Sequence, residues 1–290
     1  MHRYLLHNGA IHETSRKLLS PGQVGLLSGW GVFSTILVTG GVLFAFERHW
    51  ARMRRDAALL RISFPTDSAE VRGWLLELVE ANRAWEATLR IAVVRNRGGM
   101  WEGPGIDRDA DLIAYTADLQ TWGAGVRLAV QPNARHSACG FAGTKMLSWA
   151  FNLAWLEQAR ERGFDEVVLL NEMGQISECT SANVFLAHGD RIWTPPLSSG
   201  CLPGVTRELL LEEVRVQGIT VAEKPLRPQE LESADEVFIT STTRGLLPVL
   251  AVDGFTVRQN GSARAPIEAA YAEYLRNYVG RVRSRLETRF

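Results

Sequence analysis

The chain has little lysine, little cysteine and no excess of charge of either sign. Its 290 residues include 32 Lys or Arg and 32 Asp or Glu, so the formal net charge is zero. A neutral chain gives no electrostatic reason to expect nucleic acid or a membrane surface as a partner. The three cysteines, Cys139, Cys179 and Cys201, are odd in number and far apart. They support neither a disulfide framework nor a cysteine-based metal cluster.

Long hydrophobic runs are also missing. No apolar run approaches the roughly 18–20 residues that span a bilayer. The first residues lack the apolar core of a signal peptide. Apolar residues make up 46% of the chain and charged residues 22%, as in ordinary globular proteins. We therefore expect a soluble cytoplasmic protein.

The scarcity of lysine makes the position of each one informative. Lysine occurs only at Lys17, Lys145 and Lys224, and the other 29 cations are arginine. Lys145 lies in the largely apolar stretch 139–151. Arginine keeps its proton in proteins, whereas a desolvated lysine amine can lose its proton and attack a carbonyl. Lys145 is therefore a candidate to form a Schiff base. The alternative is a lysine that extends from a helix end into water.

Strand-like and helix-like segments alternate along the chain, which predicts an α+β protein. The pattern lapses at 118–125, which we interpret as a linker between a small N-terminal domain, 1–117, and a larger C-terminal domain, 126–290. Strands are predicted at 4–7, 36–39, 42–46, 89–94, 111–116, 126–130, 166–170, 182–187, 191–194 and 237–240, and helices at 48–61, 67–85, 146–162, 204–216 and 266–286.

Glu178 stands between a predicted turn at Met173-Gly174 and an apolar strand. A carboxylate that faces the interior there needs a cationic partner. The alternative is a glutamate at a strand edge, in water. The sequence therefore marks Glu178 as a candidate without naming its partner.

Two further stretches suit a phosphate group. A Pro-Gly turn at 203–204 precedes an amphipathic helix, whose free N–H groups and Thr206 hydroxyl can bind an anion. The strand that ends near Thr240 leads into a hydroxyl-rich turn. The alternatives are simple helix capping and a turn that satisfies its own backbone. Arg52 lies among several cations at a helix start, which are usually solvated.

The order and spacing of these stretches resemble the class IV, or fold-type IV, pyridoxal-phosphate aminotransferases. This family includes branched-chain aminotransferases, D-amino-acid aminotransferases and 4-amino-4-deoxychorismate lyases. The resemblance runs from Asn8-Gly9 to Pro248-Val249 and is most specific over Lys145–Arg207. It implies a D-amino-acid aminotransferase-like fold of two domains, in which the larger domain binds the cofactor. It also implies a homodimer with the active site between domains and near the subunit interface.

The resemblance implies a role for each matching residue. Lys145 forms the Schiff base with pyridoxal 5'-phosphate and moves the proton between the substrate Cα and the cofactor. Glu178 pairs with the protonated pyridine nitrogen. Phe33 lies where the family lines its substrate pocket. The phosphate-binding residues are Arg52, Val205, Thr206, Thr242 and Ser241.

Several positions bear on the substrate. The loop Arg97–Glu102 lacks the Arg and His pair with which D-amino-acid enzymes bind the substrate carboxylate. Arg90 resembles the pocket-side arginine of branched-chain enzymes. Phe33, with Trp30 and Trp101, would suit an apolar side chain. A tyrosine common after the lysine is absent, and Ser34-Thr35 resembles the lyases.

We therefore expect a transaminase that moves an amino group from a hydrophobic, branched-chain-type L-amino acid to 2-oxoglutarate. The alternatives are a D-amino-acid or (R)-amine transaminase, a 4-amino-4-deoxychorismate lyase, and a cofactor-binding protein without turnover. Other signatures fail: the sequence around Lys145 lacks P-loop spacing, and there is no Gly-x-Ser-x-Gly elbow or Gly-x-Gly-x-x-Gly loop.

Overall fold

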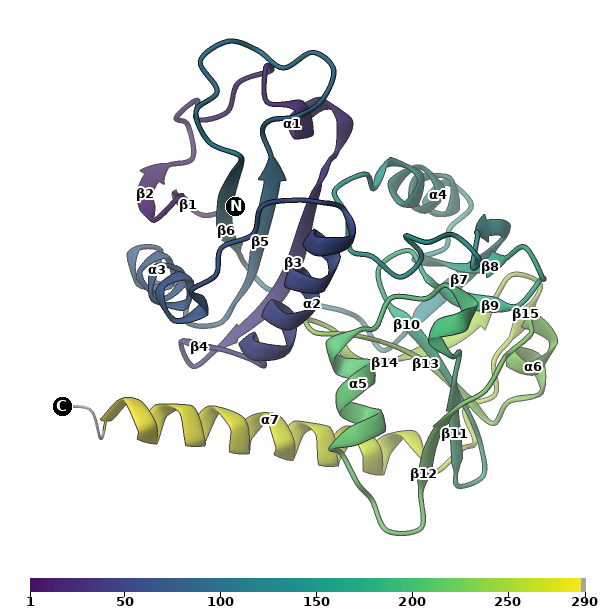
Figure 1. Ribbon diagram of the computed structural model, residues 1–290. Helices are drawn as coiled ribbons and strands as arrows, with labels where there is room; N and C mark the ends of the chain where they lie inside the picture. Colours follow the sequence, from purple (N-terminus) through teal and green to yellow (C-terminus); the bar gives the residue numbers. More distant parts are fainter. Residues whose placement is uncertain (288–290) are drawn as a thin grey trace. The chain divides into compact units, whose positions relative to one another are not determined.

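The structure is a computed structural model that describes residues 1–287 (Figure 1). Helices and sheets are mixed along the chain, which confirms the predicted α+β class. Two compact units are present. The first comprises Met1–Gln120, Thr144–Trp149 and the chain from Asn277 onward, and the second comprises Thr121–Gly143 and Ala150–Arg276. None of the described helices is long and apolar enough to cross a membrane.

The units differ from the predicted domains in two segments. The first unit ends at Gln120, within the predicted linker 118–125, but it also takes in Thr144–Trp149 and the end of the last helix. The sequence had assigned both segments to the domain 126–290. The functional division into a small domain and a cofactor-binding domain remains a prediction.

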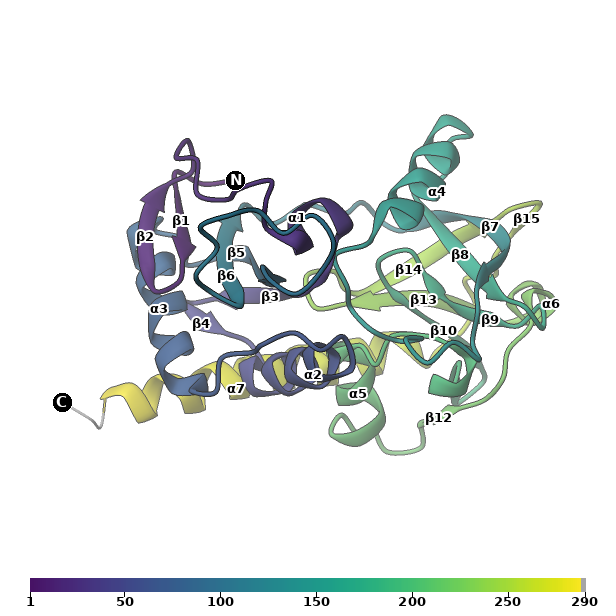
Figure 2. The ribbon, with the colours of Figure 1, turned by 45° about the horizontal axis from the view of Figure 1, so that its top comes forward.

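The first unit is built on a six-stranded antiparallel sheet with the order β2-β1-β6-β5-β3-β4. Helices α2 and α3 lie on the same side of this sheet (Figure 2), with α2 against β3 and α3 against β1 and β6. Met53 of α2, Leu75 of α3 and Leu89 of β5 are buried in the resulting core. The elements are β1 (Tyr4–His7), β2 (Ala10–Glu13), α1 (Val24–Ser28), β3 (Gly31–Thr39), β4 (Val42–Leu43), α2 (Phe46–Leu59), α3 (Ser68–Ala81), β5 (Ala87–Arg95) and β6 (Ala110–Ala117).

Local sequence signals explain the element ends in this unit. Gly40 and Gly41 have φ values of 54° and 75°, so they can form the tight hairpin turn between β3 and β4. The strand predicted at 42–46 is too long, because Phe46 already begins α2. Asp67 accepts the N–H groups of Ala69 and Glu70 and thereby caps α3.

The second unit contains a nine-stranded mixed sheet with the order β12-β11-β10-β13-β14-β7-β8-β9, and β15 pairs with β14. The pairs β14–β7, β7–β8 and β11–β12 are parallel. Phe185 and Phe238 stack in its interior with ring centroids 5.2 Å apart. The strands are β7 (Val126–Arg135), β8 (Glu166–Asn171), β9 (Ile176–Cys179), β10 (Asn183–His188), β11 (Arg191–Thr194), β12 (Thr220–Glu223), β13 (Glu236–Ser241), β14 (Gly245–Val252) and β15 (Phe255–Thr256). The helices are α4 (Ala150–Glu161), α5 (Val205–Glu212), α6 (Pro228–Ser233) and α7 (Arg264–Glu287), of which α7 continues into the first unit.

The helix predicted over 146–162 is wrong at its start. Helix α4 begins only at Ala150, and the preceding segment Thr144–Trp149 is extended beside β3. Phe33 N–H donates to the Lys145 carbonyl at 3.0 Å, and Leu147 N–H donates to the Gly31 carbonyl at 2.8 Å. These bonds to a distant strand replace the helical bonds that the apolar spacing had indicated.

Candidate active site

Lys145 belongs to the first unit, on the extended segment Thr144–Trp149. Its N–H donates to Oδ2 of Asp56 on α2 at 3.0 Å, and its carbonyl accepts the Phe33 N–H. The amine Nζ lies 4.5 Å from the centroid of the Phe33 ring. The main chain of Lys145 is therefore held on both sides, and its amine lies against an aromatic ring.

Arg52 lies near this lysine in the same unit. It is 8% exposed, and its Nη2 donates to Oγ of Ser34 on β3 at 2.9 Å. Ser34 Oγ also lies 2.8 Å from Nδ1 of His49, one turn before Arg52. Burial lowers the pKa of His49 well below its usual value, and the charges of Arg52 and Lys145 lower it further. His49 is therefore neutral at pH 7.

Arg90 and Phe33 form a second contact beside Lys145. The Arg90 guanidinium carbon lies 3.9 Å from the Phe33 ring centroid and 5.9 Å from that of Trp149. Phe33 is 2% exposed. Within residues 1–287, Arg90 has no ion-pair partner among the carboxylates. The same ring thus contacts an amine and a guanidinium that is available for an anion.

The other two predicted pocket residues lie apart from this cluster. Trp30 donates its Nε1 to the Leu60 carbonyl at 2.8 Å, and Arg95 lies 4.0 Å above its ring. Trp101 is 90% exposed, on the loop between β5 and β6. Among the described residues, the ring that packs against Phe33 is that of Trp149, and neither Trp30 nor Trp101 forms a ring pair with it. The structure therefore brings together Lys145, Phe33 and Arg90, but not Trp30 or Trp101.

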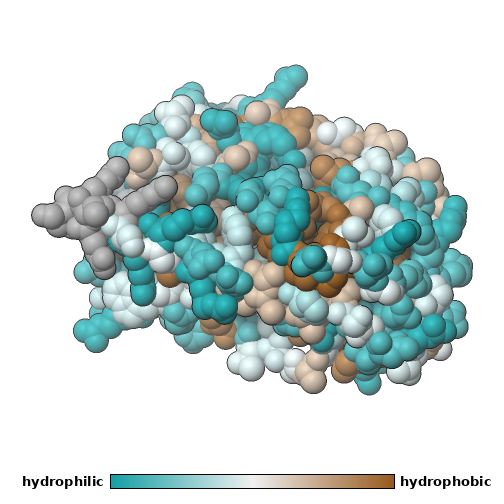
Figure 3. Space-filling view, turned by 90° about the horizontal axis from the view of Figure 1, so that it is seen from below, coloured by the Kyte–Doolittle hydropathy of each residue, from teal (hydrophilic) through white to brown (hydrophobic). Residues whose placement is uncertain are grey.

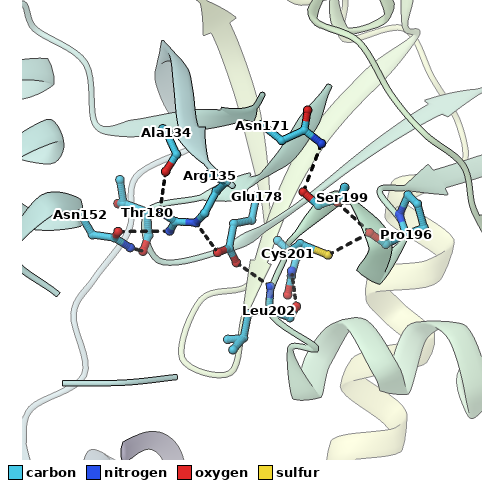
Figure 4. Close-up of polar contacts among 11 residues, drawn as sticks. Ala134, Arg135, Asn152, Asn171, Glu178, Thr180, Pro196, Ser199, Cys201 and Leu202 are labelled. Carbon is cyan, nitrogen blue, oxygen red and sulfur yellow. Dashed lines mark hydrogen bonds and ion pairs between the residues drawn. The ribbon is translucent and has the colours of Figure 1, made fainter. Parts of the chain in front are cut away.

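In the second unit, Glu178 of β9 has the cationic partner that its position requires (Figure 4). Its Oε1 accepts from Nε of Arg135 at 3.1 Å, and its Oε2 accepts from the Leu202 N–H at 3.0 Å. Arg135 Nη2 donates to the side chain of Asn152 at 3.1 Å, and Asn152 donates to the Thr180 carbonyl. Arg135 and Asn152 thus hold the carboxylate of Glu178 in place.

A second buried carboxylate, that of Glu166, binds the residues that directly follow β9. Glu166 is 1% exposed and accepts from the hydroxyls of Thr180 and Ser181 and, at 3.2 Å, from Arg244. Arg244 follows the hydroxyl-rich turn after β13, and its guanidinium lies 4.2 Å from the ring centroid of Trp122. This network ties that turn to the end of β9, two residues from Glu178.

The start of α5 offers the free donors that the sequence predicted. Gly204 is the N-cap residue, and no side chain caps the helix. The N–H groups of the first helical turn, at Val205 and Thr206, therefore lack intrahelical partners. A Cβ on Gly204 would lie 2.0 Å from Oδ1 of Asn183, so a larger residue there would have to displace the Asn183 side chain, which donates to the Leu202 carbonyl. The helix start is thus a close-packed site with donors for an anion.

The turn after β13 adds further hydroxyl groups. Thr240 is 1% exposed, and its Oγ1 has no hydrogen-bond partner among the described residues. Ser241 ends β13, and Thr242 follows it in the turn. A buried hydroxyl without a partner is costly unless a ligand satisfies it. The donors at α5 and at this turn fit a phosphate group.

The nearby thiols are not nucleophiles. Burial raises the pKa of Cys201 to about 11 and that of Cys179 well above its usual value. Among the described residues, no group of His, Cys, Asp and Glu has the arrangement of a metal site. The groups suited to chemistry are therefore the Lys145 amine and the carboxylate of Glu178.

Comparison with known proteins decides the family. The sequence profile described as amino-transferase class IV matches residues 31–252. The chain belongs to the class IV aminotransferases. It is 31% identical to D-alanine aminotransferase of Bacillus licheniformis over 257 residues, which cover 87% of this chain and 89% of that protein. It is 30% identical to a putative branched-chain-amino-acid aminotransferase of Methanocaldococcus jannaschii over 251 residues, which cover 85% of this chain and 87% of that protein.

The fold agrees with this membership. The crystal structure of Escherichia coli branched-chain amino acid aminotransferase superposes with a TM-score of 0.84 and 24% identity, covering 95% of each chain. Class IV aminotransferases are enzymes that depend on pyridoxal phosphate. The buried Thr240 hydroxyl, the uncapped start of α5 and the paired carboxylate of Glu178 fit the phosphate and ring nitrogen of this cofactor.

Proposed function

We propose that this aminotransferase moves the amino group of a hydrophobic, branched-chain-type L-amino acid to 2-oxoglutarate. The observation that carries the proposal is the contact of both Lys145 Nζ and the Arg90 guanidinium with the Phe33 ring. The Lys145 amine binds the cofactor and moves the proton at the substrate Cα, Arg90 binds a carboxylate and Phe33 lines an apolar pocket. A dicarboxylic acceptor and a hydrophobic donor together match these three groups.

The roles of the cofactor residues follow from their contacts. Pyridoxal phosphate, when bound, supplies the carbonyl that takes up the amino group and the ring that withdraws electrons from the substrate Cα. Lys145 binds the cofactor and carries the proton to and from the substrate Cα. Glu178 holds a proton on the ring nitrogen, and Arg135 keeps its carboxylate oriented.

Several groups of the chain suit the phosphate of the cofactor. Arg52 supplies the charge, and its partner Ser34 fixes the guanidinium. The N–H groups of Val205 and Thr206 bind at the start of α5, with the Thr206 hydroxyl nearby. The hydroxyls of the turn after β13 bind as well, at Ser241 and Thr242.

The substrate range is broad. Phe33 is the apolar surface closest to Lys145, and an apolar surface discriminates by only about 1–3 kcal/mol per methylene group. Leucine, isoleucine and valine are therefore all donors. Arg90 binds the second carboxylate of 2-oxoglutarate, because in the described chain it has no carboxylate partner of its own.

A second candidate is transamination of a D-amino acid. It is favoured by the 31% identity to a D-alanine aminotransferase. The loop that carries the carboxylate-binding Arg and His in such enzymes argues against it. Here Arg97 binds Glu102 at 3.4 Å and lies 3.9 Å from Asp109, and the second residue after it is glycine. Arg97 therefore already has carboxylate partners.

We also propose that the enzyme is a homodimer. Hydrophilic residues cover most of the face seen in Figure 3, and hydrophobic ones gather in a smaller part of it. Several large apolar side chains are exposed, among them Trp101, at 90%, and Phe151 of α4, at 75%. Such side chains are typical of an interface between subunits. Sedimentation should give twice the mass of one chain at micromolar concentration.

One substrate panel tests the proposal. L-leucine, D-leucine, D-alanine, (R)-1-phenylethylamine and aminodeoxychorismate are assayed with 2-oxoglutarate, and aminodeoxychorismate is also assayed without an acceptor. We expect L-leucine to give the highest kcat/KM. Turnover of D-alanine far above L-leucine would establish the second candidate. Release of pyruvate from aminodeoxychorismate without an acceptor would identify a lyase.

A further inference from the structure

The peptide N–H of Lys145 has a side-chain acceptor. The segment that carries Lys145 pairs with β3 through the Lys145 carbonyl and the Leu147 N–H. The Lys145 N–H takes no part in that pairing and donates to Oδ2 of Asp56 at 3.0 Å. Asp56 lies on α2, so a helix and a strand hold the two main-chain groups of one residue.

Asp56 is fully buried, at 0% exposure, and both of its oxygens are used. Oδ1 accepts from Nε and Nη2 of Arg55 at 2.9 and 2.5 Å. Oδ2 accepts from Lys145. A carboxylate without such bonds is strongly disfavoured in a protein interior, and a bond from an N–H to a carboxylate is stronger than one to a neutral acceptor. The carboxylate is therefore fixed by its own contacts and fixes the peptide group in turn.

We propose that Asp56 is the positioning residue of Lys145, an inference that rests on the proposed role of this lysine. Because both main-chain groups are held, the reach of the amine is set by side-chain torsions alone. The amine therefore returns to the same place after each turnover. Arg52 lies four residues earlier on α2. One helix thus positions the lysine and the arginine proposed to bind the phosphate.

Hydrogen exchange in the protein without cofactor tests the contact directly. The amide of Lys145 is followed in the wild type and in the variants Asp56→Ala, Asp56→Asn, Arg54→Ala and Asp67→Asn. Asp56→Ala should speed its exchange at least about tenfold, as expected for the loss of a bond to a charged group. Asp56→Asn should give a smaller effect, because its amide oxygen still accepts the Lys145 N–H while Arg55, 44% exposed, turns to water.

The other two variants are matched controls. Arg54→Ala removes an exposed arginine of the same helix and leaves both partners of Asp56 in place. Asp67→Asn removes the charge of a carboxylate that accepts two N–H groups at the start of α3, at 2.8 and 3.0 Å. It therefore weakens these hydrogen bonds and reports the effect of a general loss of stability. Both should leave the exchange of the Lys145 amide within about twofold of the wild type.

A second readout follows the lysine amine. Pyridoxal phosphate is added to the protein without cofactor, and the growth of visible absorbance is timed. Asp56→Ala should slow this step about tenfold, whereas Arg54→Ala and Asp67→Asn should not. If instead Lys145→Ala keeps the visible absorbance, the proposed function fails, while the exchange result still decides the role of Asp56.

Three results overturn the proposal. One is a wild-type rate of Lys145 amide exchange in Asp56→Ala. Another is a rise in exchange that is shared by all amides of the first unit. The third applies if Asp56→Ala does not fold. In that case a Lys145 amide that exchanges in the wild-type protein as fast as in an unstructured peptide would contradict the contact.

Discussion

The guanidinium of Arg135 lies 3.1 Å from the carboxylate of Glu178, so the proposed partner of the cofactor ring nitrogen is charge-paired within its own unit. The two side chains are 22% and 12% exposed. Because Asn152 binds the other end of the guanidinium, Arg135 cannot swing away without breaking a second bond. The carboxylate therefore has a fixed direction before any ligand binds.

Glu178→Gln should retain the cofactor and slow proton removal from the substrate Cα about 100-fold, because an amide cannot keep a proton on the ring nitrogen. The rate is measured as exchange of the Cα hydrogen for deuterium in a single turnover. Glu230→Gln is the control, since it is the same substitution at a glutamate of α6 that forms an ion pair with Lys224. Equal rates in Glu178→Gln and the wild type would rule out the proposed role.

Arg52→Ala should weaken the binding free energy of pyridoxal phosphate by about 1–3 kcal/mol, the value of a charge-assisted phosphate contact, and so raise the dissociation constant. Arg54→Ala is the matched control, because Arg54 is an exposed arginine of the same helix. Equilibrium dialysis of both variants gives the two constants. Equal affinities of Arg52→Ala and Arg54→Ala would remove Arg52 from the phosphate site.

Arg90→Leu should raise the KM for 2-oxoglutarate at least about tenfold, because the second carboxylate loses its charged partner. Pyruvate has only one carboxylate, so its KM should change little and serves as the internal control. The measurement is the half-reaction with each keto acid. A parallel loss for both acceptors would show that Arg90 does not recognise the second carboxylate.

His49 should make the protein less stable in mild acid. Its pKa in the folded state is lowered, first by burial and then by Arg52 and Lys145. In the unfolded chain His49 therefore binds a proton near pH 6.5, whereas in the folded chain it stays neutral at that pH. The free energy of unfolding falls as the pH drops below that value. The loss between pH 7.5 and 5.5 should be about 1 kcal/mol.

Urea unfolding of the protein without cofactor measures this loss at both pH values. His49→Asn keeps a polar partner for Ser34 and removes the titrating group. Its stability should depend less on pH over the same range. A variant as acid-sensitive as the wild type would contradict the burial argument.

Local pattern predicted much of the fold. The helix starts near residue 67 and after Gly204 depend on residues close in sequence, and each lies where the sequence indicated. The start of α4 was wrong because the apolar spacing of 146–149 fits a helix equally well. Its extended form depends on pairing with β3, more than 100 residues away.

The sequence likewise marked only those candidate-site residues that carry a local signal. Unusual residues or turn signals in short stretches singled out Lys145, Glu178 and the start of α5 as candidates. Their partners Asp56 and Arg135 were missed, because each is an ordinary charged residue whose role appears only when distant elements come together. Arg135 at the end of β7 gave no local signal that separated it from other arginines.

The absorbance and turnover of Lys145→Ala test the central claim most directly. We expect this variant to lack the visible absorbance of lysine-bound cofactor and to lose nearly all transamination. Lys17→Ala and Lys224→Ala are the controls and should resemble the wild type, since Lys224 is a surface residue paired with Glu230. Normal transamination by Lys145→Ala, or absorbance retained at the wild-type level, would contradict the assignment of this lysine.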